Sequence, residues 1–270
     1  MGVIADMMRR NEDAGYRGAN LTAKVCQDIV LEAIAKSTLS RNVTIKGGVV
    51  MRELTGDVRR ATQDMDIDFI RYSLRDDAID TFVEKLNVMD GVTFKRIGDI
   101  TELSHQDYHG KSITVTVTDN DGVSVQSKID LGVHTHLDVK QEEFCFDIGY
   151  DDEGVCLLIN SKEQMFTEKL RSLLKFGAAS TRFKDIFDMY YLKDRLDMDR
   201  LKVCLDEYIF DDPGMKENTM GDIIIRLERT FRSRRYISRL SGSDKNWLGI
   251  EISTTLSGIM DFMKSCQGNA

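Results

Sequence analysis

Residues 64–70, Asp-Met-Asp-Ile-Asp-Phe-Ile, alternate strictly between aspartate and apolar side chains. This alternation predicts a β-strand with Asp64, Asp66 and Asp68 on one face and the apolar side chains in the core. Three carboxylates in one row repel one another unless a cation neutralises them, and hard divalent metals bind through oxygen. The segment therefore predicts a divalent-metal site, with a solvated strand face as the alternative.

A calcium-binding EF-hand loop also begins with aspartates at alternate positions. Such a loop needs glycine at its sixth position and glutamate at its twelfth. The residues at those positions are Phe69 and Arg75, so an EF-hand is excluded here.

A further carboxylate stands on the second strand of a predicted hairpin. Two alternating runs, 111–118 and 123–133, flank the turn sequence Asp-Asn-Asp-Gly at 119–122. This is the pattern of a β-hairpin. The second run has one mostly apolar face, and Asp130 lies on its polar face. Asp130 is therefore in a position to join the aspartates of the earlier strand if both strands belong to one sheet.

Gly47 and Gly48 lie between a short predicted strand at 43–46 and a helical stretch at 49–56. Glycine lets the backbone approach a ligand closely, and the first amides of a helix point toward an anion. Paired glycines alone are weak evidence, because strand-to-helix turns also use glycine for steric reasons. The order of parts is more informative, since a strand with paired aspartates follows sixteen residues later.

Four blocks occur in a fixed order: Gly47-Gly48, Arg60-x-Thr62-x-Asp64-x-Asp66, Asp130 in KIDLG, and a helix lysine followed by R-x-K-D-x-x-D within 168–192. Together they resemble the nucleotidyltransferases of the DNA polymerase β superfamily. Within that superfamily the sequence is most similar to the AbiEii/AbiGii family of abortive-infection and toxin–antitoxin toxins. The resemblance covers about residues 40–195.

The resemblance implies transfer of a nucleotide from a nucleoside triphosphate to an acceptor hydroxyl, with two magnesium ions roughly 3.5–4 Å apart. It makes Asp64, Asp66 and Asp130 the metal ligands and catalytic residues, with Asp130 also taking the hydroxyl proton. Asp68 would have a supporting role. The implied nucleotide-binding residues are Gly47, Gly48, Lys169, Arg182, Lys184 and Asp185.

The resemblance also implies a cytoplasmic toxin of a toxin–antitoxin or abortive-infection pair, with a cognate antitoxin and an RNA acceptor such as the 3′ end of a tRNA. One alternative is transfer to a small molecule, such as an aminoglycoside, or to a protein. Another is a degenerate, non-catalytic binding module. Val49 favours the last, because the family usually has Ser or Thr there and valine offers phosphate no hydrogen bond. The complete aspartate set argues against it.

The cationic residues of the second half also have simpler interpretations. Lys169 lies inside the apolar arc of its predicted helix, so it either reaches the triphosphate or extends to the edge of the helix. Lys184 and Asp188 have the spacing of a surface ion pair. Only the family resemblance gives Lys184, Arg182 and Asp185 a role at the nucleotide.

The composition describes a folded chain of 270 residues, with 41% hydrophobic residues, 30% charged residues and one proline. It excludes wholesale disorder, and we expect neither a signal peptide nor a membrane span. Strand patterns end near residue 160 and helical patterns follow. With the resemblance, we expect an α+β fold: a polymerase-β-like nucleotidyltransferase domain with a small mixed sheet at 1–160, and a helical domain at 161–270 that completes the nucleotide and acceptor cleft.

The net charge of −8 excludes a general polyanion binder, so any RNA contact needs a local basic surface. Between residues 226 and 239 the chain carries six arginines and only one carboxylate. This cluster is the predicted acceptor contact, and a solvated helix face is the alternative.

The five cysteines are odd in number, scattered and never spaced as CxxC. They predict a reducing cytoplasm, no disulfide framework and no zinc ribbon. The histidine pairs His105/His109 and His134/His136 have no further ligands at a recognisable spacing. We therefore predict structural or surface roles for all four histidines.

Overall fold

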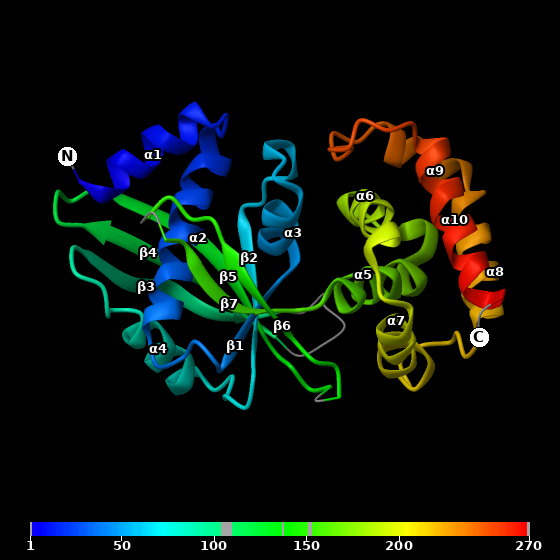
Figure 1. Cartoon of the computed structure of the whole chain (residues 1–270), viewed down its shortest axis with the longest axis horizontal. Coiled ribbons are helices and arrows are strands. Elements are labelled where there is room, and N and C mark those ends of the chain that lie inside the picture. Colours follow the sequence, from blue (N-terminus) through cyan, green and yellow to red (C-terminus); the bar gives the residue numbers. More distant parts are fainter. Residues whose placement is uncertain (1, 104–109, 137, 151–152, 269–270) are drawn as a thin grey trace. The chain divides into compact units, whose positions relative to one another are not determined.

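The computed structural model describes residues 2–103, 110–136, 138–150 and 153–268 (Figure 1). The chain divides into two compact units, Met1–Asn160 and Ser161–Ala270. The division falls where the strand patterns of the sequence give way to helical ones. His105 and His109 lie outside the described residues.

The N-terminal unit is built on a mixed sheet, which among the described residues has seven strands in the order β3-β4-β5-β2-β1-β7-β6. The strands are β1 Val43–Lys46, β2 Asp64–Phe69, β3 Val92–Glu102, β4 Lys111–Asp119, β5 Ser124–Val133, β6 Glu142–Phe146 and β7 Val155–Ile159. β2 pairs antiparallel with β1 and parallel with β5. The strand that carries the aspartates therefore lies between the strand before the two glycines and the strand that carries Asp130.

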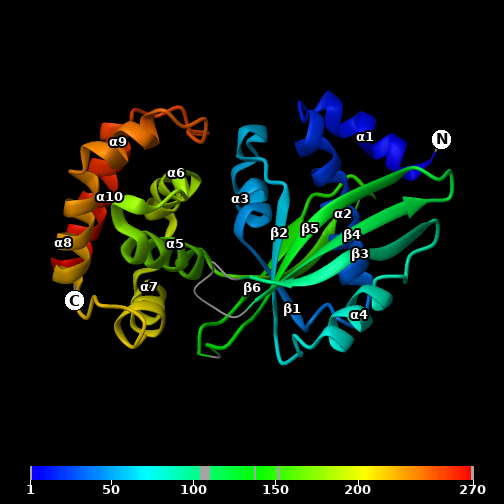
Figure 2. The same cartoon turned by 180° about the vertical axis from the view of Figure 1, so that it is seen from behind.

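Four helices belong to this unit in its described part: α1 Val3–Asp13, α2 Gly18–Lys36, α3 Gly47–Thr55 and α4 Asp76–Lys85. Figures 1 and 2 show α2 running across the sheet, where it contacts β4, β5 and β7. Its long buried face, with Val25 and Ile29 fully buried, supplies much of the core. α3 starts directly after β1 and packs against β1 and β2. The sheet and α2 thus fix the position of the turn between β1 and α3.

The predicted strand at 64–70 and the predicted hairpin of 111–118 with 123–133 are confirmed as β2 and the β4–β5 pair. β3 and β6 were not predicted. β3 has buried side chains at Val92 and Phe94, but its second half is mostly exposed, so the alternating pattern is lost after a few residues. β6 is only five residues long and half exposed.

The C-terminal unit is helical in its described part, with α5 Lys162–Phe176, α6 Phe183–Leu192, α7 Met198–Leu205, α8 Met220–Phe231, α9 Arg234–Ser241 and α10 Ile252–Gly268. Ser161 caps α5, because its hydroxyl accepts a hydrogen bond from the Gln164 amide at 3.1 Å. The helical pattern at 216–240 forms two helices, α8 and α9. Ser233 interrupts it by capping α9 through the Tyr236 amide.

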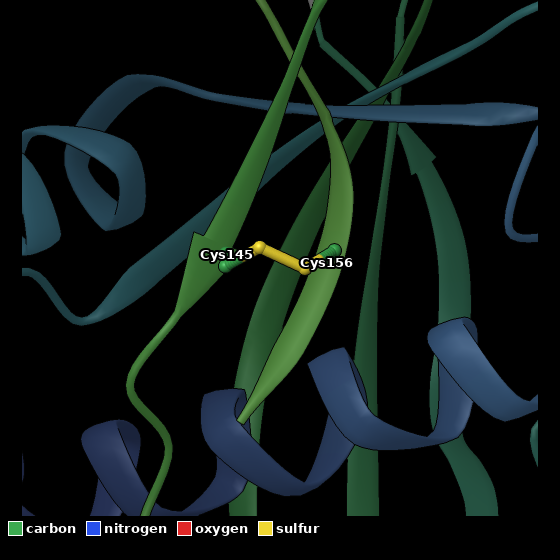
Figure 3. The surroundings of a disulfide bond; sticks show 2 residues. All are labelled: Cys145 and Cys156. Carbon is green, nitrogen blue, oxygen red and sulfur yellow. A yellow bond between two sulfur atoms is a disulfide. The ribbon is translucent and has the colours of Figure 1, made fainter. Parts of the chain in front are cut away.

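Cys145 on β6 and Cys156 on β7 form a disulfide bond (Figure 3). The expectation of no disulfide is therefore wrong. The two residues stand directly opposite each other in the antiparallel β6–β7 pair, which brings together cysteines eleven residues apart. The remaining cysteines are buried free thiols, and burial raises the pKa of Cys26 and of Cys204 to about 12.

In the described part of the chain, every helix is too short or too polar to cross a lipid bilayer. His134 is buried and lies 2.8 Å from Gln141 Nε2, in keeping with the structural role predicted for it. Burial lowers the pKa of His134, although the nearby charge of Asp68 raises it.

Candidate active site

The predicted catalytic aspartates project from one face of the sheet. β2 and β5 run in parallel register, with Asp64 beside Lys128 and Asp66 beside Asp130. Residues paired in this way point to the same face. The opposite face of β2 packs into the core as expected, because Met65, Ile67 and Phe69 are fully buried. The aspartates on the polar face are therefore Asp64, Asp66, Asp68 and Asp130.

The two glycines let the turn before α3 lie directly against this face. Gly47 has a φ of 64°, a conformation that favours glycine. A Cβ atom there would also lie 2.9 Å from Asp66 Cγ. A Cβ atom on Gly48 would lie 2.6 Å from the hydroxyl oxygen of Thr62. Both glycines are therefore required by close packing, Gly47 against Asp66 in β2 and Gly48 against Thr62 just before β2.

Val49 follows the two glycines in the first turn of α3, and its side chain is fully buried. Valine offers a phosphate no hydrogen bond. The expectation that Val49 weakens phosphate binding stays a prediction, and the non-catalytic module stays an alternative.

Asp68 has a different environment from the other aspartates. Its carboxylate lies 2.7 Å from Lys46 Nζ, and both side chains are buried. Lys46 is the last residue of β1 and comes directly before the two glycines. This ion pair joins β2 to the end of β1, and the supporting role of Asp68 beside the other aspartates stays a prediction.

Lys128 is a site residue that the sequence reasoning missed. Its ammonium lies 3.0 Å from Asp130 Oδ1. Burial lowers the pKa of Lys128, but the hydrogen bond to Asp130 and the charges of Asp130, Asp64 and Asp66 raise it above its usual value. The signal was present in the sequence, since residues two apart in a strand share a face. Lys128 partly neutralises the carboxylate row.

The chemistry of these donors fits a hard divalent metal, which binds carboxylate oxygens. Asp130 Oδ1 is buried and, apart from the ion pair with Lys128, accepts no hydrogen bond from a described group. Among the described side chains, however, no three acidic, histidine or cysteine residues already lie close enough to share one ion. The roles of Asp64, Asp66 and Asp130 as metal ligands stay predictions.

In the helical unit, Lys169 is buried between α5 and α6. Its ammonium lies 2.9 Å from Asp185 Oδ1 and 2.9 Å from Asp188 Oδ2. Asp188 is fully buried and also accepts a hydrogen bond from Trp247 Nε1 at 3.1 Å. Lys169 therefore does not extend to solvent, and Asp188 is not the surface residue that its spacing from Lys184 predicted.

Arg182 extends the same network. Its Nε donates to Asp185 Oδ2 at 2.6 Å, and the arginine itself is exposed. Burial raises the pKa of Asp185, but the charges of Lys169 and Arg182 outweigh it and hold that pKa below its usual value. Arg182 precedes α6 as its N-cap residue, and Lys184 lies in the first turn of the helix and is half-buried. The roles of these residues in nucleotide binding stay predictions.

The arginine cluster between 226 and 239 is partly structural. Arg226 Nε donates to the Leu174 carbonyl at 2.9 Å, and Arg239 donates to the carbonyls of Ala178 and Ser180. These bonds hold the end of α5 and the turn that follows it. The exposed arginines of the cluster are Arg229, Arg232, Arg234 and Arg235.

A groove of about 350 Å³ lies beside α8 in the helical unit. Four cationic residues and two carboxylates line it, together with Ile225, a residue that is 60% exposed. One of the carboxylates, Asp222, is engaged in capping α8. The cationic residues of this basic groove are Lys175, Lys216, Arg226 and Arg229.

Two solved structures resemble the chain at low identity. One is an antigenic nucleotidyltransferase-like protein from Paracoccidioides brasiliensis, with 16% identity and a TM-score of 0.45 over 82% of this chain and 93% of that one. The other is the antibiotic-resistance factor ANT(2'')-Ia, with 15% identity and a TM-score of 0.42 over 68% of this chain and 92% of that one. At these scores neither likeness defines the fold or the substrate of this chain. Among curated proteins, no sequence matched.

The sequence does match a known family over most of its length. Residues 29–247 fit the sequence profile described as "Nucleotidyl transferase AbiEii toxin, Type IV TA system". The match includes the glycine turn, the aspartate strand, Asp130, and the network around Lys169. The family named from the sequence motifs is thus confirmed, and the chain belongs to the AbiEii nucleotidyltransferase toxins.

Proposed function

We propose that this nucleotidyltransferase transfers a nucleotide from a nucleoside triphosphate to a hydroxyl of RNA, with magnesium, as the toxin partner of a cognate antitoxin. The observation that carries the proposal is the parallel register of β2 with β5, in which Asp66 stands beside Asp130 on the face that Gly47 contacts. Family membership supplies the reaction class, and this face supplies residues with the required chemistry.

The reaction joins an acceptor oxygen to the α-phosphorus and releases pyrophosphate. Asp64, Asp66 and Asp130 would hold magnesium, which supplies positive charge to the triphosphate and to the attacking and leaving oxygens. Asp130 takes the proton of the attacking hydroxyl. Lys128, at 3.0 Å, orients the Asp130 carboxylate for that transfer.

The triphosphate would lie at the glycine turn. The first amides of α3 point out of the helix at Gly47 and Gly48, and its N-cap residue, Lys46, makes no side-chain capping bond. These amides and the positive end of the helix dipole favour an anion. The family resemblance also assigns Lys169, Arg182, Lys184 and Asp185 to nucleotide binding, and in this proposal Asp185 orients Lys169 and Arg182.

The basic groove beside α8 is the proposed contact for the acceptor RNA. A protein with a net charge of −8 needs locally concentrated cations to hold a polyanion. The groove draws Lys175 and Lys216 together with Arg226 and Arg229, so it extends the arginine cluster with residues from outside it. The exposed side chain of Ile225 offers an apolar surface for a base.

The test is to incubate the natural protein with each α-labelled nucleoside triphosphate, magnesium and total cellular RNA, and to separate the products. Label in RNA is the expected result. Label in protein or in small molecules would instead support the other acceptors considered for the sequence. No label in any fraction would support a non-catalytic binding module.

A further inference from the structure

Thr62 lies directly against the glycine turn. A Cβ atom built on Gly48 would lie 2.6 Å from Thr62 Oγ1, 2.7 Å from Thr62 Cβ and 2.9 Å from Thr62 Cγ2. The backbone of Gly48, unlike that of Gly47, is not in the left-handed region. Glycine at position 48 is therefore required by the Thr62 side chain, which occupies the space where a side chain of residue 48 would begin.

The position of Thr62 is fixed from both sides. Its hydroxyl donates to the Asp64 carbonyl at 3.2 Å, in an exposed hydrogen bond. Its own carbonyl accepts from Gln27 Nε2 at 3.3 Å, and Gln27 in turn accepts from Arg52 at 2.6 Å. Arg52 belongs to α3, the helix that begins at the glycine turn. The same helix that presents its amides at the turn thus helps to hold Thr62 beside them.

Thr62 offers a hydroxyl at this turn, whereas its neighbours Val49 and Lys46 do not. Val49 is buried and apolar, and Lys46 is engaged with Asp68. Thr62 is half-buried, so its hydroxyl remains within reach of a ligand. A hydroxyl can exchange one acceptor for another by rotating about a single bond, and the exposed Asp64 carbonyl that it leaves can bond to water.

We propose that the hydroxyl of Thr62 donates a hydrogen bond to a phosphate oxygen of the bound nucleoside triphosphate. Thr62 then supplies the hydroxyl contact that other family members are expected to supply from the residue after the two glycines. This inference rests on the proposed function, because it needs the triphosphate at the glycine turn. A hydrogen bond to a charged group corresponds to about a ten- to hundredfold change in affinity.

The first experiment compares Thr62→Val with Thr62→Ser, by calorimetric titration of each protein with nucleoside triphosphate and magnesium in the absence of acceptor. Valine keeps the shape of threonine and removes the hydroxyl, so the affinity should fall about ten- to hundredfold. Serine keeps the hydroxyl and should bind close to the natural affinity. Thr81→Val is the matched control, because it removes a threonine hydroxyl that bonds to the Asp77 carbonyl on α4, and its affinity should not change.

A second pair of variants moves the hydroxyl across the turn. Thr62→Gly removes all three atoms that lie nearest to a Cβ atom on Gly48, so Gly48→Ser combined with Thr62→Gly can place a hydroxyl there from the other side. This double variant should recover much of the lost affinity, whereas Gly48→Ala combined with Thr62→Gly should not. A purely structural role for Thr62 would not distinguish serine from alanine at position 48.

The outcomes separate this inference from the proposed function. If the natural protein binds nucleotide and Thr62→Val binds it equally well, the role of Thr62 is overturned and the proposed function stands. If the natural protein binds no nucleoside triphosphate, both are overturned. Equal affinities of the two double variants, one with Gly48→Ser and the other with Gly48→Ala, would also overturn the role of the hydroxyl.

Discussion

Gly47 and Asp66 are packed so closely that a single added carbon on the glycine would lie 2.9 Å from the carboxyl carbon of the aspartate. Gly47 lies in the turn after β1, and Asp66 lies in the middle of β2. The strands β1 and β2 pair in antiparallel register. The contact sets how near the first amides of α3 come to the aspartate face. The contact leaves no room for a Cβ atom. Glycine is therefore needed at position 47 for close packing against Asp66, in addition to its backbone conformation.

Gly47→Ala should therefore reduce nucleotidyl transfer far more than it reduces stability. The variant meets both an unfavourable φ, which costs about 1–2 kcal/mol, and the Asp66 carboxylate. Gly56→Ala is the matched control, because Gly56 ends the same helix with a φ of 61° and nothing within 4 Å of an added Cβ. Both variants should lose the stability that the unfavourable φ costs, Gly47→Ala should lose more because of its contact with Asp66, and only Gly47→Ala should lose activity. Equal activity in the two would contradict the packing argument.

Lys169 should stabilise the helical unit, whatever its part in binding. Lys169→Met leaves Asp185 and Asp188 buried without their shared cation, and should lower the free energy of unfolding at pH 7 by about 3–5 kcal/mol. Urea unfolding measures this loss. Lys169→Arg keeps the charge and should lose less. An unchanged free energy of unfolding in Lys169→Met would contradict the network described for α5 and α6.

The same network predicts a pH dependence. The folded pKa of Asp185 lies below its usual value of 3.8, so its ionised form stabilises the folded protein above that pH. This stability is lost as the pH falls through the folded pKa. In Lys169→Met, the charge of Lys169 no longer counteracts the effect of burial, so the pKa of Asp185 rises and protonation removes its unpaired charge. The difference in unfolding free energy between the natural protein and Lys169→Met should therefore shrink as the pH is lowered from about 7 toward about 4. A constant difference would argue against the coupling of Asp185 to Lys169.

The disulfide of Cys145 and Cys156 gives a prediction that does not involve the active site. Reduction should lower the stability of the N-terminal unit by about 2–3 kcal/mol, because it releases a short closed loop in the unfolded chain. Alkylation under native conditions should modify these two exposed cysteines only after reduction, while the buried Cys26, Cys204 and Cys266 stay protected. Native labelling of Cys145 before reduction would show that the bond is not formed.

Sequence alone predicted the elements that have strong local signals. The alternation at 64–70 set the face of each aspartate, and the turn residues at 119–122 set the hairpin that carries Asp130. The ordered motifs then identified the family. These features depend on residues close together in the chain, where the spacing determines the geometry.

What the sequence did not predict depends on register between distant strands. The Cys145–Cys156 bond needed β6, whose short and half-exposed strand has no clear alternation. The burial of Val49 needed the orientation of α3 on the sheet, which a motif comparison does not contain. The position of Thr62 against Gly48 also follows from how β2 enters the sheet beside α3. In each case the missing information was tertiary packing.

If the face shared by Asp64, Asp66 and Asp130 performs nucleotidyl transfer, the rate of nucleotide incorporation into RNA should depend on Asp66, and Asp66→Asn measures that dependence. Asp68→Asn, two residues along the same strand, is the comparison, because Asp68 is held by Lys46. Circular dichroism would confirm that both variants are folded. Asp66→Asn should show no detectable incorporation, and Asp68→Asn should show measurable incorporation. Incorporation by Asp66→Asn at the rate of the natural protein would mean that this face does not perform the transfer.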